Sequence, residues 1–317
     1  MPALTPAQLR AINTFVDTGI MGGRRSVVPQ WDSVAAKRTQ GNALGTYAWM
    51  NDIPLIAQRQ IGGYQKAGVS SQSFQITSKL QGLVLEISAR DVRDDLIGVY
   101  QDLPGKLGQR MEQFPQDSLF NLFKEGDQTT YLGESILAYD GLAFFHDSHL
   151  TDGRSSAGGT YDNFLASTAL TKANFEVACA SLALFPDNRG VAMNQRPTHL
   201  IVPPQLGITG ADILLAQTIS TGGSNTSNAE YLAARGLPPI QLVVCPELSG
   251  DSTTWYLTCM GQGRAPMIWQ ETAPLMVIAQ TSPDSPNMLN DDMLLWYAKG
   301  ESGFAFGDPR CAIRCVA

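Results

Sequence analysis

The sequence has 317 residues, of which 44% are hydrophobic and 16% are charged, and a formal net charge of −7. This length can bury a core in two ordinary domains or in one elaborated domain. The acidic balance argues against tight, direct DNA binding, which needs Lys and Arg clustered on one face. Because globular domains usually have about 25% charged residues, we expect sister chains to cover much of this surface. A monomer with a neutral Ser, Thr and Gln surface is the alternative.

The cysteines and the apolar runs indicate a reduced protein that does not enter a membrane. The five cysteines lack C-x-x-C spacing, so we expect them to be reduced and mostly packed, as in a protein made in the cytoplasm. Cys311 and Cys315 would share one face of a strand in a structural role rather than as a metal pair. No apolar run approaches the roughly 18 residues of a membrane span, and the first residues lack a signal-peptide core. The cysteines are Cys179, Cys245, Cys259, Cys311 and Cys315.

The N-terminal segment is predicted to be a short helix followed by an arm. Residues 5–8, Thr-Pro-Ala-Gln, have the capping-box pattern with proline at the first helical position, so a helix is predicted to about Asp17. Three glycines between residues 19 and 23 are predicted to break it. Residues 24–45 have few periodic apolar positions, so we expect an arm ordered by contacts with other subunits. A disordered tail is the alternative.

Extended segments are predicted between residues 49 and 87. Phe74 and Ile76 alternate with polar residues, and a second alternating run follows over residues 82–87, which is the period of a strand with one covered face. Residues 53–61 are predicted to be a further extended segment. Two strands alone are marginally stable, so a hairpin in this region must find cover elsewhere.

The longest helical pattern runs over residues 103–125 and would reach about 35 Å as an unbroken helix. Pro104 is compatible with the first turn, Pro115 is predicted to bend the helix, and Gly126 is predicted to end it. The apolar residues form one stripe, which consists of Leu103, Leu107, Met111, Phe114, Leu119, Leu122 and Phe123.

A histidine cluster follows a Tyr-Asp-Gly turn at residues 139–141. His146, Asp147 and His149 suggest a metal site, because imidazole and carboxylate groups are common zinc ligands. A further ligand would have to come from elsewhere in the chain, so we favour a hydrogen-bonding role in a loop. The Gly/Ser-rich residues 151–160 are the best candidate for a crossing between domains.

The C-terminal half is predicted to be an α/β domain followed by returning strands. A helix capped by Thr171 is predicted over residues 172–185, and a second helix over 210–220. The polar loop 221–228 separates this helix from the later strands, and turns are predicted at 299–300 and 307–309. The predicted strands span 198–202, 237–244, 254–260, 266–270, 275–279, 291–297, 303–306 and 311–316.

No motif of a catalytic site is present. The sequence contains no Walker phosphate loop, and Gly261-Gln262-Gly263 lacks the rest of a dinucleotide fingerprint. Residues 153–158 resemble a nucleophile elbow only superficially, since the second glycine falls one place late. His199 lies within an apolar strand motif, where a core histidine is more common than a catalytic base. We therefore predict no catalytic residue, no cofactor and no metal.

Several short motifs resemble, in their order, landmarks of the Mu-like major head subunits, the major capsid proteins of tailed bacteriophages. The resemblance covers roughly residues 47–309, and it depends on the shared order rather than on any single motif. The motifs are Trp49, Pro54, Ile61-Gly62, Arg90-Asp91, residues 94–100, residues 122–126, Tyr139-Asp140-Gly141, Phe144-Phe145, His149, residues 197–204 and Trp255-Tyr256-Leu257.

The resemblance implies an α+β fold, the Hong Kong 97-like fold of tailed-phage heads and encapsulins. Its expected parts are an N-terminal arm at 1–46, an extended loop hairpin at 47–90, a peripheral domain with a long spine helix at 91–165, an axial α/β domain at 166–290, and C-terminal strands at 291–317 that return to the peripheral domain.

The resemblance also implies which residues take part in assembly. The extended loop would lie across the adjoining subunit, and the axial loop would lie near a symmetry axis. The expected residues are Trp49, Pro54, Gly62, Tyr64, Lys66, Phe74 and Ile76 for the loop and arm; Leu107, Met111 and Phe114 for the spine helix; and Gly222, Gly223 and Asn225 for the axial loop.

The implied function is that of a major capsid protein, made in the bacterial cytoplasm and carried in the virion. Pentamers and hexamers would close into an icosahedral shell that encloses double-stranded DNA without sequence-specific binding and without a membrane. Scaffolding, portal and decoration proteins are the expected partners, and the first residues could be removed on maturation. The alternatives are an encapsulin-like nanocompartment shell and, from another class, a metal-dependent hydrolase that uses His146, Asp147 and His149.

Overall fold

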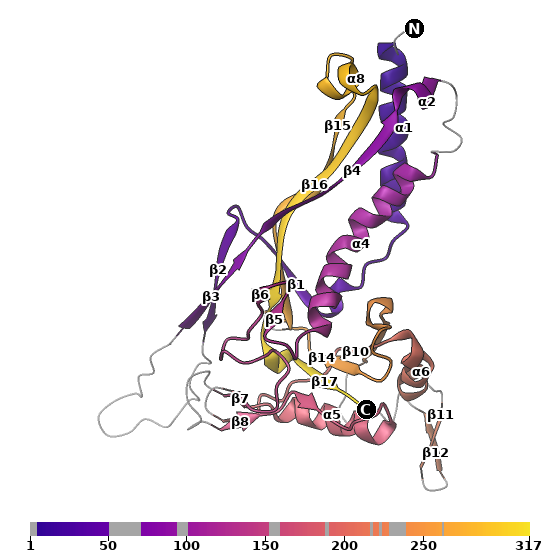
Figure 1. Ribbon diagram of the computed structural model, residues 1–317. Helices are drawn as coiled ribbons and strands as arrows, with labels where there is room; N and C mark the ends of the chain where they lie inside the picture. Colours follow the sequence, from indigo (N-terminus) through magenta and orange to yellow (C-terminus); the bar gives the residue numbers. More distant parts are fainter. Residues whose placement is uncertain are drawn as a thin grey trace.

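A pair of long helices and a long strand ribbon stand above a five-stranded sheet (Figure 1). The computed structural model describes residues 5–50, 71–93, 101–151, 159–187, 190–215, 218–221, 224–227, 239–261 and 263–317. The predicted extended segment at 53–61 and the Gly/Ser-rich loop at 152–158 lie outside the described residues.

The described chain contains both helices and largely antiparallel sheets, so the predicted α+β class is confirmed. The α-helices are α1 (Pro6–Arg25), α2 (Ala89–Arg93), α4 (Leu103–Lys124), α5 (Lys172–Leu184), α6 (Gly207–Leu215) and α8 (Pro286–Asn290). The short 3-10 helices are η1 (Trp31–Ser33), η3 (Pro204–Leu206), η4 (Pro246–Leu248) and η5 (Pro309–Cys311).

Two larger sheets carry the architecture. The first has the order β1-β15-β16-β4, with β1 (Ala35–Thr39), β15 (Met267–Gln280), β16 (Met293–Phe306) and β4 (Lys79–Ser88). The second has the order β13-β10-β14-β17-β9, with β13 (Gln241–Val244), β10 (His199–Val202), β14 (Trp255–Thr258), β17 (Ala312–Cys315) and β9 (Phe164–Leu165).

Four two-stranded pairs complete the described strands. The hairpin of β2 (Leu44–Met50) and β3 (Ser71–Thr77) leads directly into β4. The smaller pairs are β5 (Thr130–Tyr131) with β6 (Glu134–Ser135), β7 (His149–Leu150) with β8 (Thr160–Tyr161), and β11 (Thr218–Thr221) with β12 (Ser224–Ser227).

The first helix is longer than its glycines predict. The capping box at Thr5 is confirmed, but α1 runs on to Arg25, so the predicted end near Asp17 is wrong. A Cβ on Gly23 would overlap the carbonyl of Gly105 in α4, and a Cβ on Gly108 would overlap the carbonyl of Ile20. The glycines therefore let the two helix backbones touch. The burial gained there offsets the roughly 1 kcal/mol by which each glycine disfavours a helix.

The long helix is confirmed almost residue for residue, since α4 spans Leu103–Lys124 and continues through Pro115. Leu107 and Met111 pack with α1 and the ribbon. Leu119, Leu122 and Phe123 pack farther down, in a core that also contains Phe144 and Tyr256. The same stripe therefore joins the upper and lower parts of the molecule.

The arm is ordered by this chain itself over part of its length. Strand β1 pairs in parallel with the first half of β15, and Val34 and Ala35 are buried in the core below α4. The expectation that residues 24–45 depend mainly on other subunits is therefore wrong for residues 31–39. Sequence periodicity misses this strand because it is short and only its first residues face the core.

Several strands differ in extent from their predictions. The two strands predicted at 266–270 and 275–279 form the single strand β15, and those predicted at 291–297 and 303–306 form β16. The turn predicted at residues 299–300 is wrong, because both residues lie within β16. At Gly300 the two strands approach so closely that a Cβ would lie 3.0 Å from the Leu275 backbone. The helix predicted over 210–220 ends at Leu215, and β11 begins at Thr218.

The C-terminal strands divide between the two sheets. Strand β16 lies between β15 and β4 in the ribbon, but β17 pairs with β14 and β9 in the five-stranded sheet. Strand β17 nevertheless lies at the end of the long helix, where Arg314 donates to the Lys124 carbonyl. The predicted return of the C-terminal strands to the peripheral domain stays a prediction. Helix α5 covers the five-stranded sheet with the predicted residues Phe175, Ala178 and Leu182, and Thr171 caps it as expected.

Candidate functional site

The outer face of the strand ribbon is apolar and uncovered. Val84, Tyr297 and Ile278 form one row across β4, β16 and β15. Val84 is 39% exposed and Ile278 is 41% exposed, whereas the neighbouring row on the other face includes Ala298, which is 2% exposed. One face therefore packs on the helices, and the other offers apolar surface in a monomer.

The β2–β3 hairpin is anchored to its own chain at its base. Tyr47 stacks on the cross-strand neighbour Phe74 with ring centroids 5.4 Å apart, and its hydroxyl donates to Gln270 Oε1 at 3.0 Å. Ile76 is only 3% exposed and packs against β16. Phe74 and Ile76, which we predicted to take part in assembly, therefore serve the internal packing of this hairpin in the described chain.

Of the other predicted loop residues, Trp49 and Asn225 lie in the described part of the chain. Trp49 lies in β2 opposite Gln72. Asn225 lies in β12 opposite Ser220, so a short hairpin stands where the axial loop is predicted. The remaining predictions, Pro54, Gly62, Tyr64, Lys66, Gly222 and Gly223, lie outside the described residues.

The predicted spine-helix residues face inward. Leu107 and Met111 are 5% and 6% exposed and belong to the core between α1 and the ribbon. Phe114 makes an edge contact with Phe304 of β16 at 5.9 Å between centroids. Their side chains hold α4 against the ribbon, so a role for α4 in assembly would depend on its other faces.

His149 is a hydrogen-bonded core residue. Its Nδ1 lies 2.7 Å from Asp140 Oδ2 and its Nε2 lies 3.0 Å from the Phe144 carbonyl oxygen, with both side chains of the ion pair fully buried. Carboxylate and carbonyl oxygens accept hydrogen bonds, so both ring nitrogens face acceptors of the protein itself. Neither nitrogen is left to bind a metal ion, which contradicts the metal alternative for this histidine.

The environment of Asp140 favours its ionised form. Burial acts to raise its pKa, but the hydrogen bond and the charge of His149, with the backbone N–H groups of Leu142 and Leu150, hold the pKa below its ordinary value. Asn163, also buried, donates to the same Phe144 carbonyl and to the Pro309 carbonyl. This network fastens the turn at residues 139–145 to the C-terminal strand region.

A second buried network was not predicted from the sequence. The Arg310 guanidinium donates through Nε and Nη2 to both oxygens of Asp308 at 2.9 and 3.0 Å, and the Asp308 side chain has no exposure. Arg314 lies 2.7 Å from Asp127 and donates to the Lys124 carbonyl at the end of α4. The only sequence signal was the Gly-Asp-Pro turn at 307–309, whose aspartate caps η5.

A carboxylate pair lies where α4 meets η4. Burial is the largest cause that raises the pKa of Asp117, and the charge and hydrogen bond of Glu247 raise it further. The charge of Arg110 acts in the opposite direction. Gln116 donates to Glu247 Oε1 at 2.7 Å and accepts from the Gln30 backbone N–H at 2.9 Å. The arm, the long helix and the lower sheet therefore meet at one polar junction.

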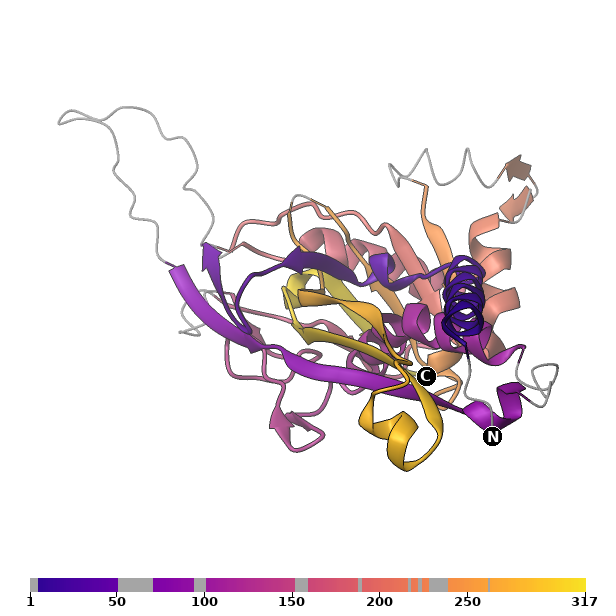
Figure 2. The same cartoon turned by 90° about the horizontal axis from the view of Figure 1, so that it is seen from above.

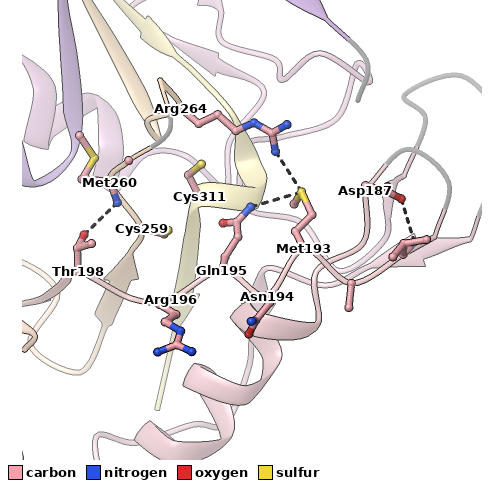
Figure 3. Close-up of a pocket in the computed structure, with 13 residues that line it drawn as sticks. Asp187, Met193, Asn194, Gln195, Arg196, Thr198, Cys259, Met260, Arg264 and Cys311 are labelled. Carbon is pink, nitrogen blue, oxygen red and sulfur yellow. Dashed lines mark hydrogen bonds between the residues drawn. The ribbon is translucent and has the colours of Figure 1, made fainter. Parts of the chain in front are cut away.

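The structure contains a cavity of about 520 Å³ beside β14 and η5 (Figure 3). Arg264 and Gln195 both reach the Met193 sulfur, at 3.0 and 3.7 Å (Figure 3). Burial raises the pKa of the Cys259 and Cys311 thiols in its wall, so neither is an activated nucleophile.

The described helices and side-chain groups bear on two other classes of protein. Every helix in the described ranges is too short or too polar to cross a bilayer. In the same ranges, no three His, Cys, Asp or Glu side chains gather as a metal site. The five cysteines are free, and all but the half-buried Cys259 are buried, as predicted.

Solved structures show the fold. The procapsid structure of bacteriophage JBD30 superposes with a TM-score of 0.56 and 17% identity over 99% of this chain and 76% of that chain. A structure from Microbacterium phage Oxtober96 gives a TM-score of 0.56 and 10% identity over 92% of this chain and 91% of that chain. The predicted Hong Kong 97-like fold is thereby confirmed.

Sequence relatives agree with this fold. The major head subunit of the Mu-like prophage FluMu of Haemophilus influenzae is 26% identical over 149 residues, which are 47% of this chain and 46% of that protein. The major capsid protein of Escherichia phage Mu is 25% identical over 161 residues, or 50% of each chain. The matches thus span about half the length of these curated relatives.

The family model described as Mu-like prophage major head subunit gpT matches residues 9–169 and 162–234. These ranges include α1, the ribbon strand β4, the long helix α4 and the start of the five-stranded sheet. Since they cover well over half of the sequence, the chain belongs to the family of Mu-like prophage major head subunits.

Proposed function

We propose that this chain is the major capsid protein of a tailed-phage head. Copies of it would form pentamers and hexamers and close into an icosahedral shell around double-stranded DNA, as a component of the virion. The observation that carries the proposal is the family match over residues 9–234. Head subunits are structural proteins, and the chain is therefore not an enzyme.

The surface of the monomer supports a role in tiling. The apolar row Val84, Tyr297 and Ile278 lacks cover within the described chain. Elongated subunits can make several contacts with neighbours, each in the standard class of about 1,200 to 2,000 Å² of buried surface. Individually weak contacts then add up around a closed shell, while misplaced subunits can still dissociate.

The charge suits a container for DNA. A net charge of −7 disfavours adhesion to phosphate groups, so the packed genome would be enclosed without sequence-specific binding. DNA release from shells purified from infected cells should therefore not depend on the salt concentration, because the DNA does not have to dissociate from this protein.

The predicted loop residues enter the proposal as assembly contacts. Residues 51–70, which include Pro54, Gly62, Tyr64 and Lys66, would extend from the β2–β3 hairpin onto a neighbouring subunit. The segment around Gly222, Gly223 and Asn225 would meet its copies near a symmetry axis. The support is the position of each segment at the end of a two-stranded pair.

Further partners follow from the neighbouring structures. The structures of JBD30 include a procapsid and a capsid decorated with minor capsid protein trimers. We infer that this chain, too, assembles first as a procapsid with a scaffolding protein and a portal, and that it can receive a decoration protein.

The test is electron microscopy of the protein expressed alone and with a candidate scaffolding protein. We expect closed shells of uniform size, and a soluble monomer under both conditions would contradict the proposal. Shells that contain an enzyme cargo in place of DNA during infection would instead identify a nanocompartment.

The loop contact has its own test. Deletion of residues 62–70 leaves β2 and β3 intact, so we expect a folded subunit that assembles poorly. A Gly/Ser segment of equal length is the matched control for the loss of contacts without a change of length. Normal shells from both variants would remove the role proposed for this loop.

A further inference from the structure

The two edges of the strand ribbon differ in how they are protected. Beyond Glu271, β15 has no partner on one side among the described residues, but Pro274 lies in this half and the register with β16 shifts on both sides of Ala273. Prolines and bulges are the usual devices that prevent an edge strand from pairing with another chain. Strand β4 has neither over its ten residues, and its register with β16 is continuous.

The hydrogen-bond pattern identifies the free groups of β4. Ala89 N–H donates to the Asp292 carbonyl at 2.8 Å, one step beyond the pair Ser88 and Met293. Bonded and non-bonded pairs alternate in an antiparallel ladder, so the odd-numbered residues of β4 bond to β16. The even-numbered residues direct their N–H and C=O groups to the free edge, and these are Leu80, Gly82, Val84, Glu86 and Ser88.

The chain itself already uses this edge one step earlier. Ser78, also even-numbered, donates its N–H to the Ala43 carbonyl at 2.7 Å, in line with the pairing of β2 and β3. Beyond Ser78, the arm turns away and the same edge continues without a partner in the described part of the chain. In Figure 2, β4 runs along the outer side of the ribbon.

Three apolar side chains of β4 are exposed beside this edge. Leu80 is 82% exposed, Leu83 is 55% exposed and Val84 is 39% exposed. A long, regular, apolar edge strand is a template for pairing with another extended segment. In a protein that must stay soluble before assembly, such an edge indicates a partner.

We propose that β4 pairs antiparallel with β4 of a second copy across a two-fold axis, with Val84 opposite Val84, which would join the two ribbons into one continuous sheet. This inference rests on the proposed function and names one of its subunit contacts. An isologous contact of this kind must be self-complementary.

The register centred on Val84 meets that requirement. It places Glu86 opposite Gly82, Leu80 opposite Ser88, and Leu83 opposite Leu85, so no like charges face each other. A register centred on Glu86 would oppose two carboxylates, which destabilises a strand pair. A register centred on Gly82 would leave the axis without side-chain contact.

The test exchanges the residue on the two-fold axis for a charge. Val84→Lys and Val84→Glu each place like charges opposite each other, so we expect each variant alone to lose shell formation. A mixture of the two in equal amounts should recover shells containing both variants at equal ratio, because Lys then faces Glu. Rescue by mixing is specific to a contact of residue 84 with itself.

Val177→Lys is the matched control, since it introduces the same charge at a residue that is 57% exposed, on α5 rather than at the β4 edge. We expect it to assemble, and thermal unfolding of all the unassembled variants should match that of the wild type. Normal shells from Val84→Lys, or no recovery in the mixture, would overturn the pairing.

A second readout separates this inference from the proposed function. Val84→Cys treated with bismaleimidoethane should give covalent dimers, whereas the wild type and Val177→Cys should not. If the wild type forms no shells with its scaffold, the proposed function fails, and the cross-link alone then decides the pairing. Shells without the Val84 cross-link would overturn only the pairing.

Discussion

The helix pair at the top of the molecule and the network at its base are held together in opposite ways. Helices α1 and α4 touch backbone to backbone at glycines, beside buried apolar side chains and the ion pair of Arg24 with Glu112. Below α4, two buried ion pairs stiffen the turn at 139–145 and the approach to the C-terminal strand: Asp140 with His149, and Asp308 with Arg310. Added side-chain volume should therefore weaken the contact between α1 and α4, whereas loss of a charged partner should weaken the base of the molecule.

This difference separates two kinds of sensitivity within one subunit. Added volume should loosen the upper contact with little dependence on pH, because the ion pair of Arg24 with Glu112 beside the glycine crossing is partly exposed and contributes little. Loss of a charged partner should affect the lower network, because a buried charge without its counterion is costly.

The largest expected effect comes from Arg310→Met at the base. It leaves the fully buried Asp308 without its bidentate partner, so we expect a loss of about 3 to 5 kcal/mol in the free energy of unfolding. Lys79→Met, in an ion pair whose side chains are 59% and 61% exposed, is the control and should cost less than about 1 kcal/mol. Urea denaturation measures both. Equal losses would mean that burial does not set the strength of the lower network.

A smaller effect with a pH signature is expected from Asp140→Asn. Because the folded pKa of Asp140 is lowered, its ionised form contributes stability above the unfolded pKa, near 3.8, and that contribution is lost as the pH falls through the folded value. The variant should therefore be less stable than the wild type by about 1.5 to 3 kcal/mol at pH 6. The difference should shrink below about pH 4. Thermal unfolding between pH 3 and pH 7 checks the sign, and a difference that grows with acid would contradict it.

At the upper contact, Gly23→Ala and Gly22→Ala form a matched pair of neighbours. A Cβ at Gly23 meets the Gly105 carbonyl, whereas a Cβ at Gly22 meets nothing within 4 Å. We expect Gly23→Ala to destabilise the subunit by about 1 to 3 kcal/mol and Gly22→Ala to stabilise it by about 1 kcal/mol. Thermal unfolding distinguishes them at any pH. Similar shifts for both would show that helix propensity, rather than volume, controls α1.

These glycines also show where sequence reasoning succeeds and where it stops. Local signals gave the capped start of α1, the whole of α4 and the buried stripe of α5, because each depends on residues a few positions apart. The end of α1 could not be predicted, since a glycine that permits contact with a distant helix looks the same as one that ends a helix. Only Gly105 and Gly108, more than eighty residues away, decide between the two.

The candidate site divides in the same way. The resemblance to head subunits gave the family and the fold, and the alternation over residues 82–87 gave a strand with one covered face. That β4 is an edge strand in the described part of the chain, and that the register of β15 shifts around Ala273, depends on which strands lie beside them. The pair of Asp308 and Arg310 could not be predicted either. The sequence indicated only a turn at residues 307–309, and the ion pair stabilises the fold because the turn is buried.

The smallest expected effect lies at the junction between the two regions, where Asp117 faces Glu247. Because the folded pKa of Asp117 is raised, the protonated form contributes stability below its unfolded pKa, and this is lost as the pH rises through the folded value. Asp117→Asn stays neutral, so it should gain on the wild type as the pH rises, by less than about 1 kcal/mol because the pair is partly solvated. Asp102→Asn, at the exposed start of the same helix without a capping bond, should show no such trend. Thermal unfolding from pH 4 to pH 8 decides the point: a variant that loses stability with rising pH would mean that Asp117 holds the junction as a carboxylate, and the arm, α4 and η4 would then be joined by charge, as the base is.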